Sequence, residues 1–319
     1  MKVASLITFV LAGMVVSPAY SQFESKEAAN GVRFGSQQTA RWQVGLKVKA
    51  PRGGPVMGIV GTVPVPTDWP EQQVRVVDED ISPDARVTYR TLNNGVKQMK
   101  VTIKQLDAGG TARALVTYEV TTSEILAPES HDEFVFAERL PKNLRHYLGS
   151  SPYIEVRDKQ IRAKARELTR DEKGAWKTVE TIYDWVRDNV EYKNGKLKGA
   201  LAALRDKDGD CEELTSLFIA LCRVNKIPAR TVWVPGHCYP EFFLQDAAGR
   251  GHWFPCQAAG TRSFGGIPDL KPILQKGDNF KVPEKRKPQR YVAELLTAKA
   301  VRGNGQPSVE FVRRLLPPE

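Results

Sequence analysis

The chain has 319 residues, of which 41% are hydrophobic and 26% charged, an ordinary composition for a globular protein long enough to form two domains. Its formal net charge of +10 at pH 7 allows contact with an anionic surface, although a diffuse basic surface is the simpler interpretation. Basic and aromatic residues do not interleave in any segment, so nucleic-acid binding is not expected.

Residues 1–21 have the pattern of a secretory signal peptide. Lys2 supplies a short basic end, an apolar run follows over 6–16, and the small residues Ala19 and Ser21 come just before Gln22. The apolar run is too short for a mature membrane span, and no later stretch is apolar enough to be one. We therefore expect cleavage after Ser21 and a secreted or periplasmic protein.

Residues 22–130 are expected to form a β-sandwich domain. Apolar and polar residues alternate in several short stretches, at 42–48, 74–76, 87–89, 99–103 and 114–120. Turn-forming Gly, Pro and Asn residues separate these stretches, and regular spacing of this kind is typical of a sandwich. This part of the chain shows no group of catalytic residues. Residues 131–157 are expected to connect it to the next domain.

Two helices are expected after this connector. Apolar residues have helical spacing over 158–168, and they recur every three or four positions over 176–190. Thr169 and Glu172 have the spacing of a capping box, which predicts that the second helix begins there.

Cys211 is expected at the first position of a third helix. Asp210 and Glu213 predict a capping box, and Asn225 marks the end of the apolar helical pattern. Backbone amides at a helix start lack intrahelical partners, and the helix dipole places positive charge there, so thiolate is favoured over thiol and an oxyanion can be received. Glu212 and Glu213 would oppose the thiolate only by pointing inward, and helix geometry is expected to turn them away.

A β-hairpin is expected to supply the base. His237 begins an apolar strand, and an imidazole beside a thiolate stabilises the ion pair. If Leu244 pairs with Arg250 in the hairpin, His237 lies directly opposite Gln257. The Gln257 amide oxygen would then orient the imidazole through its other ring nitrogen.

The same register places Cys238 opposite Cys256. These two residues would form a cross-strand disulfide, which the export signal favours, or they would be two buried free thiols. Cys222 lies eleven residues after Cys211, about three helical turns away, and is expected in the core. Because no C-x-x-C pair and no calcium-binding loop occurs, neither a metal nor a cofactor is predicted.

These motifs resemble the core of the transglutaminase-like superfamily. The similar stretches are GDCEELTSLFIALCR at 209–223, IPAR at 227–230, HCYPEFFL at 237–244, WFP at 253–255 and the upstream helix at 182–190. We therefore expect a transglutaminase-like core over 158–260, with 261–319 as a C-terminal extension packed on that core.

The resemblance implies an α+β protein in which an N-terminal β-sandwich domain is followed by a papain-like transglutaminase-core domain with a Cys-His-Asp triad. Cys211 matches the nucleophile and His237 the base, whereas Gln257 stands where the family usually has Asp. Members of the family form a thioacyl intermediate from an amide and pass the acyl group to an amine or to water. We expect thiol-dependent acyl transfer or hydrolysis on a peptide or protein substrate, with hydrolysis favoured because water needs no second substrate site.

The departure at Gln257 leaves an alternative open. A neutral amide can orient an imidazole, but it cannot stabilise an imidazolium by charge. The alternative is therefore a weakly active or inactive transglutaminase-like protein that serves as a peptide-binding scaffold, with the β-sandwich as an adhesive module.

Overall fold

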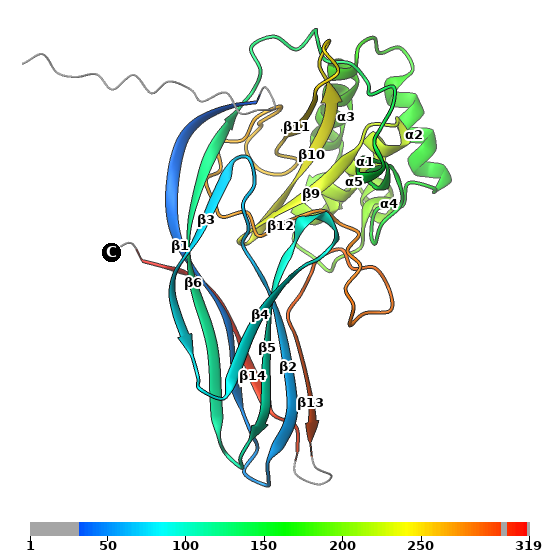
Figure 1. Cartoon of the computed structure of the whole chain (residues 1–319). Coiled ribbons are helices and arrows are strands. Elements are labelled where there is room, and N and C mark those ends of the chain that lie inside the picture. Colours follow the sequence, from blue (N-terminus) through cyan, green and yellow to red (C-terminus); the bar gives the residue numbers. More distant parts are fainter. Residues whose placement is uncertain (1–31, 301–304, 318–319) are drawn as a thin grey trace, which may run out of the picture.

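The computed structural model describes residues 32–300 and 305–317, and it has two parts, a long β-sandwich and a mixed α/β domain at one end of it (Figure 1). The expected signal peptide lies outside the described residues. Within the described ranges, no helix is both long and apolar enough to cross a membrane. The α+β fold class predicted from the sequence is confirmed.

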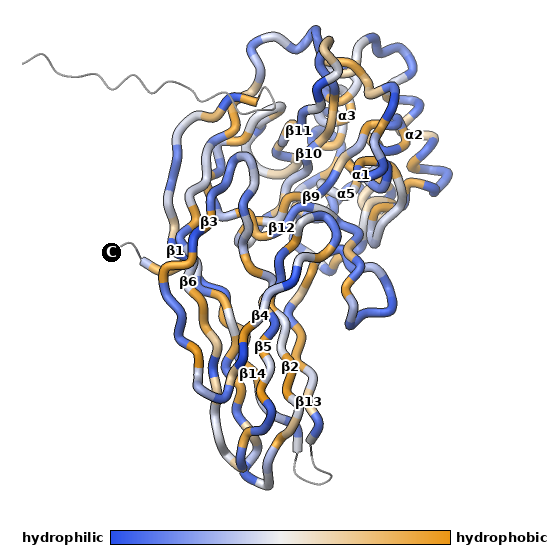
Figure 2. Tube along the Cα trace, viewed as in Figure 1, coloured by the Kyte–Doolittle hydropathy of each residue, from blue (hydrophilic) through white to orange (hydrophobic). Residues whose placement is uncertain are grey.

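The sandwich consists of two four-stranded antiparallel sheets. In the order of their strands, the first contains β14 (Ser308–Leu316), β1 (Arg33–Lys49), β6 (Thr111–Leu126) and β3 (Gln72–Ile81), and the second contains β13 (Leu295–Ala300), β2 (Val56–Val65), β5 (Lys97–Leu106) and β4 (Ala85–Thr91). Hydrophilic and hydrophobic residues alternate along these strands (Figure 2). The inward-facing residues form one core, with Leu46 and Val44 of β1 packed among Ile59, Met99 and Ile103. Burial of each such side chain contributes about 1.5–3 kcal/mol.

The C-terminal segment departs from the prediction. β13 pairs with β2 and β14 pairs with β1, so that Leu296 lies opposite Gly61 and Val312 opposite Gly45. The expectation that 261–319 packs on the core is therefore wrong for its last part, because these strands cover the edges of β1 and β2, whose amides and carbonyls would otherwise be unpaired.

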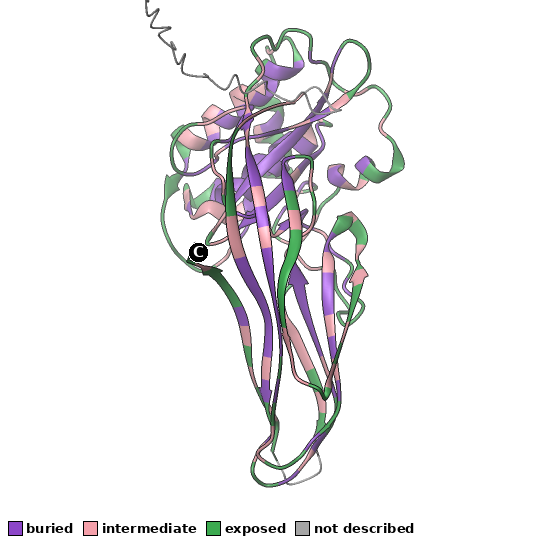
Figure 3. Cartoon of the chain, turned by 60° about the vertical axis from the view of Figure 1, so that its left-hand side comes forward, coloured by how far each residue is buried: buried purple, intermediate pink, exposed green. Residues whose placement is uncertain are grey.

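The α/β domain wraps four helices around one side of a sheet. The helices are α2 (Lys159–Thr169), α3 (Ala175–Asn189), α4 (Ala200–Asp206) and α5 (Cys211–Val224), and the sheet has the order β11 (Gly251–Pro255), β10 (His237–Gln245), β9 (Ala229–Val234) and β12 (Gln275–Lys276). Shorter elements are α1 (Lys142–Arg145), the 3-10 turns η1 (Asn93–Gly95) and η2 (His146–Leu148), and the parallel pair β7 (Glu191–Tyr192) and β8 (Asp208–Gly209). Residues 213–223 of α5 are all buried, because α5 lies between the other helices and β9 and β10 (Figure 3).

One helix start differs from the prediction. Thr169 ends α2, where its hydroxyl donates to the Ala165 carbonyl at 3.0 Å, and α3 begins at Ala175 after Gly174. The φ of Gly174 is +93°, in the region that favours glycine, so the sharp turn into α3 occurs there rather than at a capping box. The predicted capping box at Thr169 is therefore wrong.

A chain of buried ion pairs connects the sandwich to the sheet that carries the site. Lys276 of β12 pairs with Glu71, which precedes β3 in the sandwich. Lys276 also pairs with Glu241 of β10 at 2.5 Å, and Glu241 pairs with Arg230 of β9 at 2.7 Å. The Lys276 and Glu241 side chains are at most 2% exposed. Removing one partner from such a buried pair typically costs about 3–5 kcal/mol, so this network fixes β9 and β10 against the sandwich.

Candidate active site

Cys211 lies at the first position of α5, as predicted. The Asp210 carboxylate accepts from the Glu212 amide at 2.8 Å, and the Glu213 carboxylate accepts from the Asp210 amide at 3.2 Å, which completes the capping box. Backbone amides in the first turn of a helix have no intrahelical acceptor, and the Cys211 backbone amide is one of them. It can therefore donate to an oxyanion that forms beside the sulfur.

Helix geometry is expected to turn the two glutamates that follow Cys211 away from the apolar face, and in the structure each carboxylate has a partner. Glu213 is 2% exposed and accepts from the amides of Lys198 at 2.8 Å and Gly199 at 3.4 Å. Burial raises the pKa of Glu213, but these and other hydrogen bonds outweigh it and hold the pKa below its ordinary value. Glu212 forms an ion pair with Arg290, while burial raises its pKa. Each carboxylate therefore interacts with groups other than the Cys211 sulfur.

His237 lies at the start of β10, with Gln257 beside it. The His237 Nε2 and the Gln257 Oε1 are 3.0 Å apart, a distance at which a ring N–H donates to the amide oxygen. The backbone of Gln257 is fixed as well. Its backbone N–H donates to the Ser263 carbonyl at 2.8 Å, and its backbone carbonyl accepts from the Arg187 guanidinium at 2.7 Å. Arg187 also donates to the Gly260 carbonyl at 2.8 Å, so this loop is fixed to α3.

The hairpin register differs from the prediction by two. Leu244 pairs with His252, not with Arg250, and the Cys256 amide donates to the Pro240 carbonyl at 3.0 Å. A shift of two in the pairing keeps each side chain on its face of the sheet, so Gln257 becomes a diagonal neighbour of His237 and remains within reach.

The same shift separates the cysteines. Cys238 and Cys256 are not opposed, and all four cysteines are free, so the predicted disulfide is wrong. Cys256 and Cys222 lie in the apolar core, where burial raises the pKa of both thiols well above the ordinary value. Cys238 instead faces α5, with its sulfur 3.8 Å from the Thr215 hydroxyl.

Hydrogen bonding by the Cys238 thiol, the His237 ring and the Cys238 backbone amide favours the thiolate form of Cys211. Together they outweigh burial and lower the pKa of Cys211 to about 4. The bond to Cys211 is also the main cause that raises the pKa of His237. Because Gln257 engages Nε2, the ring nitrogen that serves the sulfur is Nδ1. The arrangement favours a thiolate–imidazolium pair near neutral pH.

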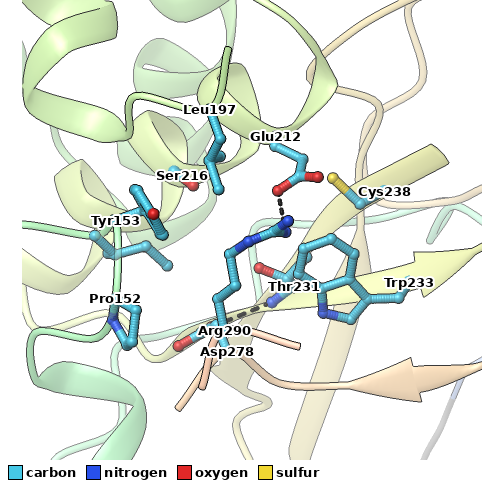
Figure 4. Close-up of a pocket in the computed structure, with 11 residues that line it drawn as sticks. Pro152, Tyr153, Leu197, Glu212, Ser216, Thr231, Trp233, Cys238, Asp278 and Arg290 are labelled. Carbon is cyan, nitrogen blue, oxygen red and sulfur yellow. Dashed lines mark hydrogen bonds and ion pairs between the residues drawn. The ribbon is translucent and has the colours of Figure 1, made fainter. Parts of the chain in front are cut away.

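A pocket of about 250 Å³ lies beside the start of α5 (Figure 4). Its walls are formed by Pro152, Tyr153, Ile154, Leu197, Glu212, Ser216, Thr231, Trp233, Cys238, Asp278 and Arg290. The Arg290 guanidinium lies 5.2 Å from the Trp233 ring centre and reaches Glu212. Arg290, at the end of the basic segment 281–290, therefore enters the pocket next to the candidate nucleophile.

Tyr192 is a candidate residue that the sequence did not single out. It is 53% exposed, and the pairing of β7 with β8 places it opposite Gly209, two residues before Cys211. Burial is the first cause that raises its pKa, and the charge of Cys211 is the second, which places the ring near the sulfur. An exposed aromatic ring at this position can contact a substrate. The only signal for it in the sequence is a tyrosine that follows the end of a helix.

A thiolate at a helix start, an imidazole from the neighbouring strand and an amide that orients the imidazole define a thiol site of the papain-like class. Residues 162–258 match the family model described as the transglutaminase-like superfamily. This part of the chain thus belongs to the transglutaminase-like superfamily, which agrees with the resemblance found in the sequence. No curated protein matches the chain.

Solved structures agree with the fold. A protein from Cytophaga hutchinsonii, provisionally named as a cysteine protease, is 17% identical, has a TM-score of 0.55, and is matched over 89% of this chain and 93% of its own. A protein from Parabacteroides distasonis, provisionally named as a protease, is 13% identical with a TM-score of 0.29, over 69% of this chain and 43% of its own. The periplasmic domain of TgpA from Pseudomonas aeruginosa bound to ethylmercury is 12% identical with a TM-score of 0.35, over 69% of this chain and 90% of its own. The first likeness shows the shared fold, and no conclusion is drawn from the other two.

Proposed function

We propose that the protein is a thiol-dependent hydrolase or acyltransferase of peptide or protein amides. In this proposal Cys211 is the nucleophile, His237 the acid and base, and Gln257 the group that orients His237. The observation that carries the proposal is the place of Cys211 at the first position of α5, where hydrogen bonding by Cys238 and His237 lowers the pKa of its thiol to about 4, while Gln257 lies 3.0 Å from His237.

The chemistry follows from these positions. The Cys211 thiolate attacks the carbonyl carbon of the amide, and the negative oxygen that forms is received by the free amide at the start of α5. The carbon–nitrogen bond breaks as the His237 imidazolium donates its proton to the leaving amine, which leaves a thioester on Cys211. Water then attacks the thioester, His237 accepts a proton from it, and the acid leaves as the thiolate is restored.

Gln257 can serve this cycle without a charge. Its oxygen accepts from Nε2–H, which leaves Nδ1 directed at the sulfur in both protonation states of the ring. In the resting site the thiolate balances the positive charge of the imidazolium. The lack of a carboxylate therefore affects the rate most after the thioester has formed, when this thiolate is absent. We favour hydrolysis over cross-linking because water needs no second substrate site.

The alternative is a scaffold that binds peptides without catalysis, favoured by the neutral Gln257 and by Arg290, which occupies the pocket beside the site. The test is a screen of the mature protein against a fluorogenic peptide-amide library and a dansyl-amine incorporation assay. Turnover that disappears in Cys211→Ser and persists in the buried-thiol control Cys256→Ala supports the enzyme. Peptide binding without turnover, equal in wild type and Cys211→Ser, supports the scaffold.

Export and domain organisation are also part of the proposal. The pattern of residues 1–21 supports removal of a signal peptide after Ser21 and a secreted or periplasmic location. We propose 22–130, completed by β13 and β14, as the sandwich domain, 131–157 as the connector and 158–260 as the core. Amino-terminal sequencing of protein recovered from the producing cells should begin at Gln22, and a chain that still begins at Met1 would contradict export by this route.

A further inference from the structure

The Cys211 sulfur has a second sulfur beside it. Cys238 is 2% exposed, and its sulfur lies 3.8 Å from the hydroxyl of Thr215, which is one helical turn after Cys211 on the same side of α5. Cys238 is also the first cause of the lowered pKa of Cys211, through its thiol and then through its backbone amide, which agrees with a position beside the Cys211 sulfur. Figure 4 shows the Cys238 sulfur close to Glu212 at the start of this helix. Two thiols from different elements are therefore neighbours at the reactive end of α5.

The two thiols differ in their state. The pKa of Cys211 is lowered to about 4, whereas the bond to Cys211, together with burial, raises the pKa of Cys238 well above its ordinary value. At neutral pH one sulfur is a nucleophilic thiolate and the other a protonated thiol beside it. Cys211 is also partly exposed, so a small oxidant can reach it, while Cys238 is shielded.

We propose that Cys238 is a resolving thiol, which closes a disulfide with Cys211 after a peroxide has oxidised Cys211. This inference goes beyond the proposed function and needs only a reactive Cys211, whatever its substrate. The disulfide would block the nucleophile reversibly. Without Cys238, further oxidation of Cys211 to the sulfinic acid would be irreversible to thiol reductants.

The disulfide forms in two steps. The Cys211 thiolate attacks one oxygen of hydrogen peroxide, the oxygen–oxygen bond breaks, and the products are the Cys211 sulfenic acid and a hydroxide that is protonated to water. The Cys238 sulfur then attacks the sulfenic sulfur. The sulfur–oxygen bond breaks, and the oxygen leaves as water together with the Cys238 proton. Two thiols are oxidised by two electrons and one peroxide is reduced.

The mature, fully reduced protein is the material for the test. It is treated with hydrogen peroxide, blocked with iodoacetamide and digested without reductant. Trypsin alone leaves Cys211 and Cys222 in one peptide, 208–223, so a second digestion after glutamate is needed to place Cys211 in 208–212 or 208–213. The expected product is a disulfide between that peptide and a peptide with Cys238, with the free-thiol count falling by two and restored by dithiothreitol. A stable Cys211 sulfenic acid, trapped by dimedone, without this cross-link would overturn the proposal.

Variants separate the resolving role from simple packing. In Cys238→Ala, peroxide should convert Cys211 to sulfinic acid, and dithiothreitol should not restore its alkylation by iodoacetamide. Cys256→Ala, which removes a buried thiol elsewhere in the core, should recover like wild type. Recovery in Cys238→Ala equal to wild type would overturn the proposal. Because each readout is chemical, failure of the thiol pair and failure of the proposed hydrolysis are seen in different experiments.

Discussion

Removal of the His237 imidazole tests the thiolate–imidazolium pair most directly. In the intact site, hydrogen bonds from Cys238 and His237 lower the pKa of Cys211 to about 4, so its sulfur should be a thiolate throughout the range above pH 5. In His237→Ala the bonds from Cys238 remain, but the contribution of the ring is lost while burial still opposes ionisation. The pKa of Cys211 should therefore move upward, towards the ordinary value of about 8.5 as a limit.

The size of the effect depends strongly on pH. At the limit of about 8.5, the thiolate fraction falls about 3,000-fold at pH 5, while a rise of about 4.5 in pKa makes the thiolate about 100-fold more nucleophilic. Alkylation at pH 5 should then be slower by up to about 30-fold. At pH 7 the thiolate fraction falls only about 30-fold, and the higher nucleophilicity offsets this loss. A measurement at neutral pH alone would miss the effect.

The assay is the rate of Cys211 alkylation by iodoacetamide, followed by intact mass from acid to alkaline pH. His131→Ala is the matched control, because His131 is exposed and lies in the connector. Wild type and the control should share a midpoint near pH 4, and His237→Ala should have a clearly higher one. Equal midpoints in all three proteins, or a wild-type midpoint near 8.5, would refute the proposed ion pair.

Three further predictions concern the groups that hold the site. Gln257→Ala should lower kcat by about 100-fold on a peptide found by the screen, because the imidazole loses its orienting acceptor. Gln257→Asp should have a higher kcat than Gln257→Ala. Equal kcat values in wild type and Gln257→Ala would show that the amide has no orienting role. Arg187→Ala should lower kcat about tenfold with little change in KM, since Arg187 acts only through the Gln257 loop, and Arg187→Lys should recover part of the loss in the same assay. Asp278→Ala leaves Arg223 buried without its ion partner, so the free energy of unfolding measured in urea should fall by about 3–5 kcal/mol. The exposed-pair control Glu167→Ala should leave the free energy of unfolding nearly unchanged, and a similar loss in both variants would contradict the role given to burial.

The parts of the site that could be predicted are those set by neighbours in sequence. The cap at Asp210 and Glu213 lies within four residues of Cys211, and a capping box needs nothing from the rest of the chain. His237 could be placed at a strand start from the apolar pattern that follows it. The helix start predicted at Thr169 was wrong for the opposite reason, because its hydroxyl found a partner inside the preceding helix.

The predicted hairpin register is wrong by one residue on each strand, which amounts to the shift of two in the pairing. Asp246 closes the turn, since its carboxylate accepts from the amides of Ala248 at 3.0 Å and Arg250 at 2.9 Å. The last pair is therefore Gln245 with Gly251, and the whole ladder shifts. An aspartate at the first position of a turn was the available signal. The His237 contact survived the error because a long amide side chain reaches a diagonal neighbour.

The position of the C-terminal strands could not be inferred from local patterns. β14 pairs with β1 across more than 250 residues of sequence, and the residues of β14 do not by themselves indicate which strand it pairs with. What selects the partner is the open edge of β1 in the folded sandwich, which exists only once β1 and β6 have paired. The same holds for Arg290, because its partners Glu212 and Trp233 are far from it in sequence and lie beside it only in the folded chain.

These non-local connections make the sandwich part of the site's architecture. The strand that begins with His237 continues to Glu241, which is held between Arg230 and Lys276, and Lys276 is held by Glu71 of the sandwich. The backbone then leaves β12, carries Arg290 into the pocket and ends in β13 and β14 on both sheets of the sandwich. Because the chain crosses from one part to the other at both ends of the core, the two parts cannot move apart without disturbing the strand that carries the base. The orientation of His237 toward Cys211 therefore depends on the packing of the sandwich as well as on the motif that identifies it.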